Sequence, residues 1–587
     1  MSHGRSQLQP YGMFLPSRPQ AQRKIADWQE LIIWSEIFRG TTVTRADFLE
    51  QVKRVGVNRG LRLVTAINTI ALRHGETSAG VQAALAADFT KGLPLVRQPI
   101  SDEIQKGRVL FSSEQITILA GYIIQYGATS EPDPDHVMYA FINAVLMVNE
   151  LFGEEQLQVR AAAGNDIESF LTIELRAAAL EHEPMDHLIA RIHAFVKWVR
   201  AQDRGSKRYV DVDAAFQSIF GQSYEDVTAA GITVWNYFRN INSVAALKIL
   251  DPILDIEFLV LPLTVQAPIR EFARAHSIRI AELAGLLADR NRMTAAALLP
   301  LQKRPLVDLG NGLYASPNLT FLSATLGIGL FHRLAEYFGT QGKRLKFYDF
   351  FARFLQNYTQ QMIALSLDKR QAPVLPEFEY RLGKKRRDSS DIIVIEGRTA
   401  IFFDVCNKRL NTELSLNAAD LKSMHADIDG MILDQAKQLD GRIVDFRAGA
   451  YTLGALTSAD IDTIIPVAVT HQSIHGWAAT RRYVDRRLCE LNYLQTGPRL
   501  EIISIAEIET LVQAFGGDLS YGELLASRAA HPQEIARGRS LKNYLLLNAG
   551  WNGKDKRGMP GYAEWFDDVA AAKLTAWGFP KDGQTPG

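Results

Sequence analysis

The chain contains 587 residues, too many for a single hydrophobic core, and typical domain sizes predict about two to four domains. Lysine plus arginine and aspartate plus glutamate both number 65, so the sequence excludes a protein that attracts nucleic acid through its overall charge. Two cysteines are too few for a disulfide framework or a cysteine-rich zinc site, and no stretch of about 18 apolar residues predicts a membrane span. These features favour a cytoplasmic protein without a membrane partner.

The N-terminal half of the chain is predicted to be helical. Residues 1–26 have the Pro-, Gln- and Arg-rich composition of an extended arm, and they lack the apolar core of a signal peptide. From 27 to 303 apolar residues recur at spacings of three and four, as in RADFLEQVKRVGVNRGLRLVTAINTIALRHG at 45–75. We expect this region to be a helical domain that serves as a scaffold or a recognition surface.

The C-terminal half changes character. Residues 304–370 are predicted to be a linker, with a β-hairpin turning at Gly310-Asn311-Gly312 and then two helices. In 371–550 helices alternate with short β-type runs, at 391–395, 399–406, 464–470 and 500–504. Residues 551–587 are expected to be a loosely packed tail with one helix near 563–576. The predicted fold class is therefore multidomain α plus α/β, with a helical N-terminal domain followed by a mixed-sheet domain.

Two aspartates stand out in the stretch DIIVIEGRTAIFFDVCNKRL at 391–410. Asp391 opens the first apolar run and Asp404 lies near the end of the second, so an antiparallel hairpin brings both carboxylates to one end. Converging carboxylates repel each other, and a divalent cation relieves the repulsion. This arrangement predicts a Mg²⁺ or Mn²⁺ site held by Asp391 and Asp404, which is the chemistry of phosphodiester hydrolysis.

The same residues resemble the PD-(D/E)XK nuclease superfamily, the restriction-endonuclease-like proteins. The resemblance rests on an acidic residue at the start of a strand, a short turn, and a second strand that ends in Asp404-Val405-Cys406, where the superfamily has Asp/Glu-x-Lys. It covers roughly residues 340–515. It implies that Gln435 or Gln438, in the helical segment DQAKQLD, orients the site.

The sequence departs from that pattern at two positions. Cys406 stands where the superfamily has its lysine, and Lys408, two residues further on the same strand face, is the candidate replacement. Gln356 stands where an upstream helix would donate a glutamate, and we expect Glu377 or Glu379 to substitute, with Glu379 assigned to the catalytic set.

A basic segment, RLGKKRRDS at 381–389, directly precedes the Asp391 strand. Lys384, Lys385, Arg386 and Arg387 are predicted to hold the phosphates of a nucleic acid beside the acidic site, and the alternative is a solvated loop.

The function expected from the sequence is a Mg²⁺- or Mn²⁺-dependent endonuclease acting on DNA. By analogy with restriction-type nucleases on helical platforms, it would act in microbial defence against phage or mobile elements. DNA is favoured over RNA because no single-strand stacking motif is visible, and no Walker lysine indicates an ATP site. A protein partner or a homo-oligomer remains open.

The alternative is a catalytically degenerate nuclease fold that serves as a nucleic-acid-binding or assembly subunit. Geometry separates the two: adjacent carboxylates with Lys408 turned inward favour the enzyme. Carboxylates facing apart, or a cation from 384–387 between them, favour the binding protein.

Overall fold

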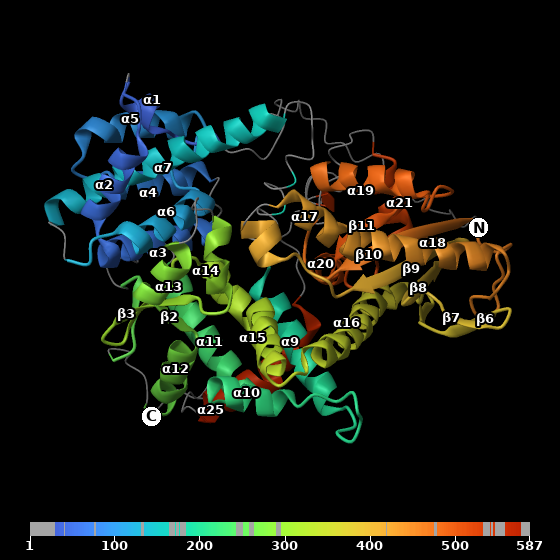
Figure 1. Ribbon diagram of the computed structural model, residues 1–587. Helices are drawn as coiled ribbons and strands as arrows, with labels where there is room; N and C mark the ends of the chain where they lie inside the picture. The colour runs from blue at the N-terminus through green and yellow to red at the C-terminus, as the bar shows by residue number, and fades with distance from the viewer. Residues whose placement is uncertain are drawn as a thin grey trace, which may run out of the picture. The chain divides into compact units, whose positions relative to one another are not determined.

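The computed structural model describes residues 30–39, 41–74, 78–130, 134–163, 171, 175, 183–241, 251–257, 263–288, 295–417, 420–474, 478–531, 541, 544–545 and 558–576. The chain divides into two compact units, which we name the helical unit and the sheet unit (Figure 1). Of the described residues, the helical unit holds those within Asp27–Gly164, Leu180–Phe347 and Pro560–Gly587, and the sheet unit holds those within Asn165–Ala179 and Tyr348–Met559.

The helical unit buries its core between amphipathic helices, with α2 packed on α7 and α3 on α6. Its first long helix, α2, begins at a reciprocal cap, because the Thr44 hydroxyl accepts from the Asp47 N–H while the Asp47 carboxylate accepts from the Thr44 N–H at 3.1 Å. The α-helices are α1 (Trp34–Ile37), α2 (Arg45–Val55), α3 (Val57–His74), α4 (Ala79–Phe89), α5 (Pro94–Gln105), α6 (Ser113–Tyr126), α7 (Pro134–Ala163), α9 (Met185–Arg200), α10 (Val212–Phe220), α11 (Tyr224–Arg239), α12 (Leu263–Ala275), α13 (Ile280–Ala288), α14 (Leu319–Ala324) and α15 (Leu330–Thr340). Two further helical segments are η4 (Ala295–Gln302), a 3₁₀-helix, and η5 (Thr325–Gly329), a π-helix.

A small sheet also belongs to the helical unit. Its strands are β1 (Ile253–Asp255), β2 (Ser277–Arg279), β3 (Leu306–Gly310) and β4 (Leu313–Ala315), in the order β1-β4-β3-β2. The predicted hairpin at Gly310-Asn311-Gly312 is present, with positive φ at all three residues. The predicted linker 304–370 is nevertheless wrong as a separate segment, because this hairpin pairs with β1 and β2 and the boundary between the units falls after Phe347.

The sheet unit is built on five strands, β5 (Val374–Pro376), β8 (Ile392–Glu396), β9 (Thr399–Cys406), β10 (Thr463–Thr470) and β11 (Glu501–Ser504). Their order is β11-β10-β9-β8-β5. β5, β8 and β9 pair antiparallel, whereas β9, β10 and β11 pair parallel, so the sheet is mixed as predicted. The four predicted strands are confirmed; the edge strand β5 was not predicted.

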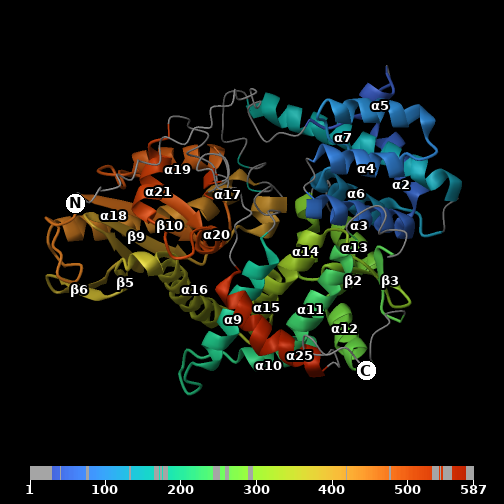
Figure 2. The same ribbon diagram turned by 180° about the vertical axis from the view of Figure 1, so that it is seen from behind.

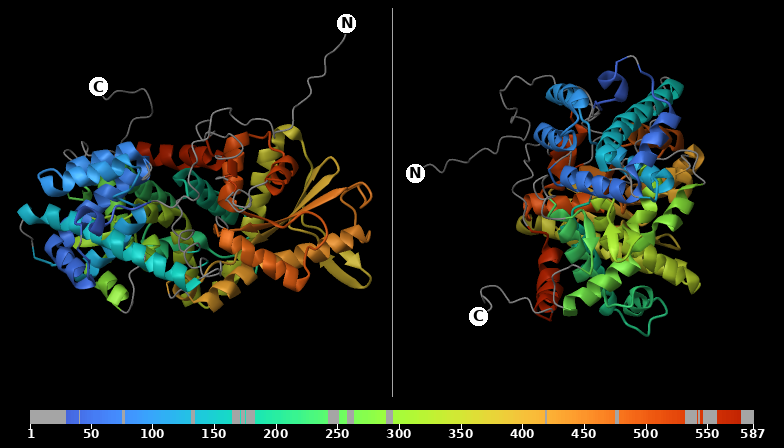
Figure 3. Two further views of the ribbon diagram at one scale, coloured as in Figure 1. Left: turned by 90° about the horizontal axis from the view of Figure 1, so that it is seen from above. Right: turned by 90° about the vertical axis from the view of Figure 1, so that its left-hand side faces the viewer.

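Helices cover both faces of this sheet (Figure 3). Phe402 packs on Phe446 of α18, with ring centroids 6.0 Å apart, and the next residue, Phe403, packs on Tyr521 of α21 at 5.5 Å. Because successive strand residues point to opposite faces, these two helices lie on opposite sides. The helices and helical turns are α16 (Arg344–Leu367), η6 (Asp368–Arg370), η7 (Thr412–Asn417), α17 (Leu421–Ile428), η8 (Asp429–Leu433), α18 (Asp434–Arg447), α19 (Ala478–Leu491), α20 (Ile505–Phe515) and α21 (Tyr521–Ala529).

A separate two-stranded hairpin joins β5 to β8. It consists of β6 (Glu379–Leu382) and β7 (Lys385–Asp388), and it turns through Gly383 at a φ of 61°. The basic segment 381–389 therefore forms part of a strand hairpin and not a loop, and its residues 381–388 are exposed, as the solvated alternative expects.

The chain returns to the helical unit at its C-terminal end (Figure 2). α24 (Pro560–Trp565), η9 (Phe566–Ala570) and α25 (Ala571–Ala576) follow one another, and α24 packs against α9. Trp565 is 2% exposed, and its indole N–H donates to the Thr228 hydroxyl at 3.4 Å. The prediction of a loosely packed tail is thus wrong for residues 560–576. Residues 1–26, expected to be an extended arm, lie outside the described residues.

No helix in the described ranges is long and apolar enough to cross a membrane. Both cysteines are free thiols, Cys406 buried and Cys489 exposed.

Candidate acidic site at the β8–β9 hairpin

Asp391 and Asp404 lie side by side where the β8–β9 hairpin opens. The pairing of Ile392 with Phe403 places the preceding residue, Asp391, opposite the following one, Asp404. The Asp391 N–H donates to Asp404 Oδ1 at 3.4 Å, and the Val405 N–H donates to Asp391 Oδ2 at 2.7 Å. Asp404 is fully buried and Asp391 is half-buried. The structure therefore brings these two predicted site residues together.

A cation from α18 completes this pair. The Arg442 guanidinium forms an ion pair with Asp404 Oδ2, and Arg442 Nε donates to the Asp388 carbonyl at 3.2 Å. The Tyr451 hydroxyl donates to the Arg442 carbonyl at 2.8 Å, which fixes the backbone that carries the guanidinium. The Arg442 side chain is only 13% exposed. The sequence analysis did not identify Arg442; the available signal was its position one and two helical turns after Gln438 and Gln435.

Burial dominates the electrostatics of the two acids. Burial raises the pKa of Asp404 to about 7; the neighbouring Asp391 charge also raises it, and Arg442 opposes the rise. Burial likewise raises the pKa of Asp391 to about 6, against the lowering effects of the Val405 N–H and of Arg442. The two carboxylates thus gain a proton more readily than exposed aspartates do.

Gln356 and Glu377 extend the site toward α16. Gln356 Nε2 donates to Asp391 Oδ1 at 3.4 Å and to Glu377 Oε2 at 3.1 Å. Glu379, the residue assigned to the catalytic set, lies instead on β6, where it is exposed and pairs with Arg386 at 3.4 Å. Glu379 therefore does not join the acidic pair in this structure, and Glu377 is the glutamate that Gln356 links to Asp391.

Lys408 does not reach the carboxylates. Its ammonium pairs with Asp434 Oδ2 at 2.6 Å, and both side chains are more than half exposed. β9 ends at Cys406, so strand alternation no longer directs the Lys408 side chain, and the expectation that it turns inward is wrong. Cys406 itself is buried, and burial raises the pKa of its thiol.

Gln435 and Gln438 lie on α18, on the helix face that also carries Arg442. Gln435 is half-buried and Gln438 is exposed. Within the described ranges neither amide is hydrogen-bonded to Asp391 or Asp404, so the structure does not assign them to the acidic pair.

The fit of a divalent metal follows from these contacts. Two carboxylates suit Mg²⁺ or Mn²⁺ by ligand type. Among the residues that the structure describes, however, no three His, Cys, Asp or Glu side chains form a group that could hold a metal ion. Arg442 moreover occupies one oxygen of Asp404. The residues, as arranged, do not fit a metal.

The β6–β7 hairpin carries a group of cations next to this site. Arg381, Lys384 and Lys385 are exposed and form no ion pair within the described part of the chain. Arg387 differs, because it pairs with Asp445 at 2.7 Å, and Asp445 also accepts from the Tyr380 hydroxyl at 2.6 Å. All four predicted phosphate-binding residues are exposed, but Arg387 is held by Asp445 and Arg386 by Glu379, so Lys384 and Lys385 are the two without an ion pair in the described part of the chain.

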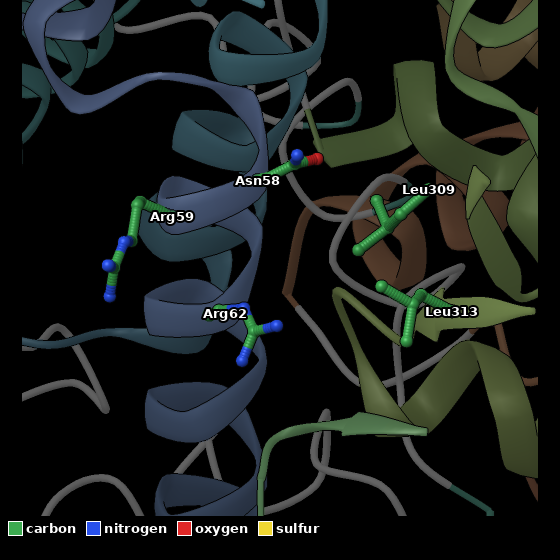
Figure 4. A pocket seen from close by; sticks show the side chains of 5 residues that line it. All are labelled: Asn58, Arg59, Arg62, Leu309 and Leu313. Carbon is green, nitrogen blue, oxygen red and sulfur yellow. The ribbon is translucent and has the colours of Figure 1, made fainter. Parts of the chain in front are cut away.

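A small pocket of about 290 Å³ lies in the helical unit, between α3 and the β3–β4 hairpin. Figure 4 shows Leu309 and Leu313 across from Asn58 and Arg62. Arg62 forms an ion pair with Asp251, so part of the positive charge at the pocket is already neutralised.

Comparison with known proteins gives no relative for this chain: no family model, no curated protein and no solved structure matches it.

Proposed function

We propose that the sheet unit binds nucleic acid through the β6–β7 hairpin, on a nuclease-like frame whose acidic site is not arranged for hydrolysis. The observation that carries this proposal is the group of exposed cations on this hairpin: Arg381, Lys384 and Lys385 have no ion pair within the described part of the chain. Arg381 also stands directly opposite Arg386, and like charges at opposed strand positions destabilise a hairpin. Glu379 offsets part of this repulsion through its ion pair with Arg386, and an anionic partner would offset the rest.

A double-stranded nucleic acid suits this hairpin in both charge and shape. Lys384 and Lys385, at the turn and directly after it, add two exposed cations to the two opposed arginines. A two-stranded ribbon fits the major groove of B-DNA, which is about 12 Å wide. Phosphate contacts from such a ribbon supply affinity for any base sequence. The net charge of the chain is zero, so attraction to a nucleic acid has to come from a local group of cations such as this one.

The acidic site supports binding over hydrolysis. Its strand–turn–strand–helix setting agrees with the resemblance to the PD-(D/E)XK superfamily. However, Cys406 replaces the lysine of the motif, Lys408 pairs with Asp434, and the cation at Asp404 is Arg442. We therefore favour a catalytically degenerate nuclease fold that serves as a binding subunit.

A Mg²⁺- or Mn²⁺-dependent DNA endonuclease is the second candidate. One observation favours it: two carboxylates with raised pKa values meet at one point, beside Glu377 and Gln356.

Fluorescence anisotropy with a DNA duplex, measured over a range of salt concentrations, tests the binding proposal. The test variant replaces Arg381, Lys384 and Lys385 with glutamine. The matched control replaces three exposed cations of the helical unit, Arg204, Lys207 and Arg208, in the same way. We expect the test variant to bind more weakly, with a salt slope smaller by roughly 2–3, since each lost phosphate contact removes about 0.9.

Equal affinity and equal salt slope in the two variants would contradict the proposal. Incubating the same duplex with Mg²⁺ or Mn²⁺ tests the second candidate. Cleavage by the wild type that Asp404→Ala abolishes would establish the endonuclease.

A further inference from the structure

All four oxygens of the acidic pair are occupied by donors from the protein itself. Asp404 Oδ1 accepts from the Asp391 N–H and Asp391 Oδ2 from the Val405 N–H, while Gln356 Nε2 donates to Asp391 Oδ1. The remaining oxygen, Asp404 Oδ2, receives the Arg442 guanidinium. Arg442 is thus the one positively charged donor among the four.

Arg442 is fixed in this position by its surroundings. Its Nε is held by the Asp388 carbonyl at the end of β7, and its own carbonyl is held by the Tyr451 hydroxyl. The side chain is largely buried. A guanidinium with several fixed partners is costly to move, because withdrawing it leaves the buried Asp404 carboxylate without a counter-charge.

Two other cations lie within four residues of the acidic pair in sequence, and both are paired with different carboxylates. Lys408 pairs with Asp434, and Arg387 pairs with Asp445. Neither contributes a contact to Asp404 in the described structure.

We propose that Arg442 is the built-in counter-cation of Asp391 and Asp404. Its guanidinium occupies Asp404 Oδ2, an oxygen that a divalent cation held by the two carboxylates would need, and thereby keeps the wild-type site closed to metal. The sequence motif that resembles a metal site is thereby satisfied by a side chain of α18. This inference does not depend on whether the β6–β7 hairpin binds nucleic acid.

Isothermal titration calorimetry of the full chain with Mn²⁺ tests the proposal. The variants are Arg442→Gln, which removes the charge, and Arg442→Lys, which keeps it; Lys437→Gln, exposed on the same helix, is the control. We expect Arg442→Gln to bind Mn²⁺ at least ten-fold more tightly than the wild type, Arg442→Lys and the control. The double variant Arg442→Gln/Asp404→Asn should lose the gained binding.

Thermal unfolding supplies a second readout that a purely structural role for Arg442 would not produce. We expect Arg442→Gln to unfold at a lower temperature than the wild type and to be restored selectively by Mn²⁺, with no such restoration in the double variant. Wild-type protein that binds Mn²⁺ tightly, in a manner abolished by Asp404→Asn, would overturn the proposal. The same conclusion would follow if Arg442→Gln folded but gained no affinity for Mn²⁺. If Arg442→Gln did not fold even with Mn²⁺, the wild type would decide, since absence of Asp404-dependent Mn²⁺ binding is the expected result.

Discussion

At the scale of one residue, burial changes the pKa of Asp404. Its carboxylate is fully buried, and its pKa is raised to about 7 by burial and by Asp391, while Arg442 opposes the rise. In the unfolded chain an aspartate titrates near its ordinary value of about 4. The folded state therefore binds a proton more tightly than the unfolded state between these two values.

This difference predicts an unusual pH dependence of stability. Because the unfolded state loses the Asp404 proton first, the free energy of unfolding should fall as pH rises from about 4 to about 7, and then level off. Asp391 should contribute in the same direction up to about pH 6. Urea unfolding of the wild type and of Asp404→Asn across this range measures the effect. We expect the difference between their free energies of unfolding, the stability gap, to change by roughly 1–4 kcal/mol over this range. A gap that stays constant with pH would show that Asp404 titrates normally.

Two helical glycines should respond to alanine in opposite directions. A Cβ on Gly231 of α11 would lie 2.6 Å from Leu326 Cδ2 and 2.8 Å from Phe272 Cε2, whereas a Cβ on Gly285 of α13 would meet nothing within 4 Å. Gly231→Ala should therefore lower the free energy of unfolding by roughly 1–3 kcal/mol through crowding. Gly285→Ala should raise it by about 0.5–1 kcal/mol through helix propensity. Chemical denaturation of both variants checks this contrast, and a loss of stability in both would contradict it.

At the scale of elements, the β6–β7 hairpin depends on one buried carboxylate. Asp445 of α18 accepts from the Tyr380 hydroxyl and pairs with Arg387, and the Tyr380 ring packs on Tyr451 with centroids 4.5 Å apart. The hairpin therefore has its own anchor, separate from the five-stranded sheet.

Tyr380→Phe should loosen this hairpin locally. Removing the hydroxyl takes away a hydrogen bond to a charged group, worth about 1.5–3 kcal/mol, but leaves the ring contact. Hydrogen exchange should show faster exchange of the β6 and β7 amides, with the β9 amides as the internal control. Equal protection of β6 and β7 in the wild type and the variant would contradict the anchoring role.

Contacts within one hairpin could be predicted from the sequence, whereas contacts between distant elements could not. The β8–β9 hairpin was predicted correctly because its short turn fixes the register of the two strands. The same register places Asp391 next to Asp404. Arg442 was missed because it is 38 residues from Asp404, and only the packing of α18 on the sheet brings them together. Strands β1, β2 and β5 are each three residues long, and β5 ends in Pro376, so none has a clear alternating pattern.

At the scale of the whole molecule, the helical unit depends on a segment that follows the sheet unit in sequence. Trp565 fills a buried position there, and Lys573 pairs with Asp226 at 2.6 Å. Sequence alone could not assign 560–576 to this unit, because the contact partners on α9 and α11 are more than 300 residues away.

Trp565→Ala should therefore destabilise the helical unit by about 3–5 kcal/mol, the usual cost of removing a large buried aromatic side chain. The neighbouring Phe566 is 45% exposed, so Phe566→Ala is a matched control with a much smaller expected effect. Calorimetric unfolding should show a lower transition for the helical unit and an unchanged one for the sheet unit. Equal shifts from both substitutions would contradict the docking of this segment.

The return of the chain to the helical unit also sets an order of events during synthesis. Tyr348–Met559 must leave the ribosome before Pro560–Ala576 can reach α9. At about 5–20 residues per second this delay is roughly 10–40 s, long enough for the intervening sheet unit to fold first. During that time the nascent helical unit exposes the apolar surface that Trp565 later covers, so its core is complete only after the sheet unit has been synthesised.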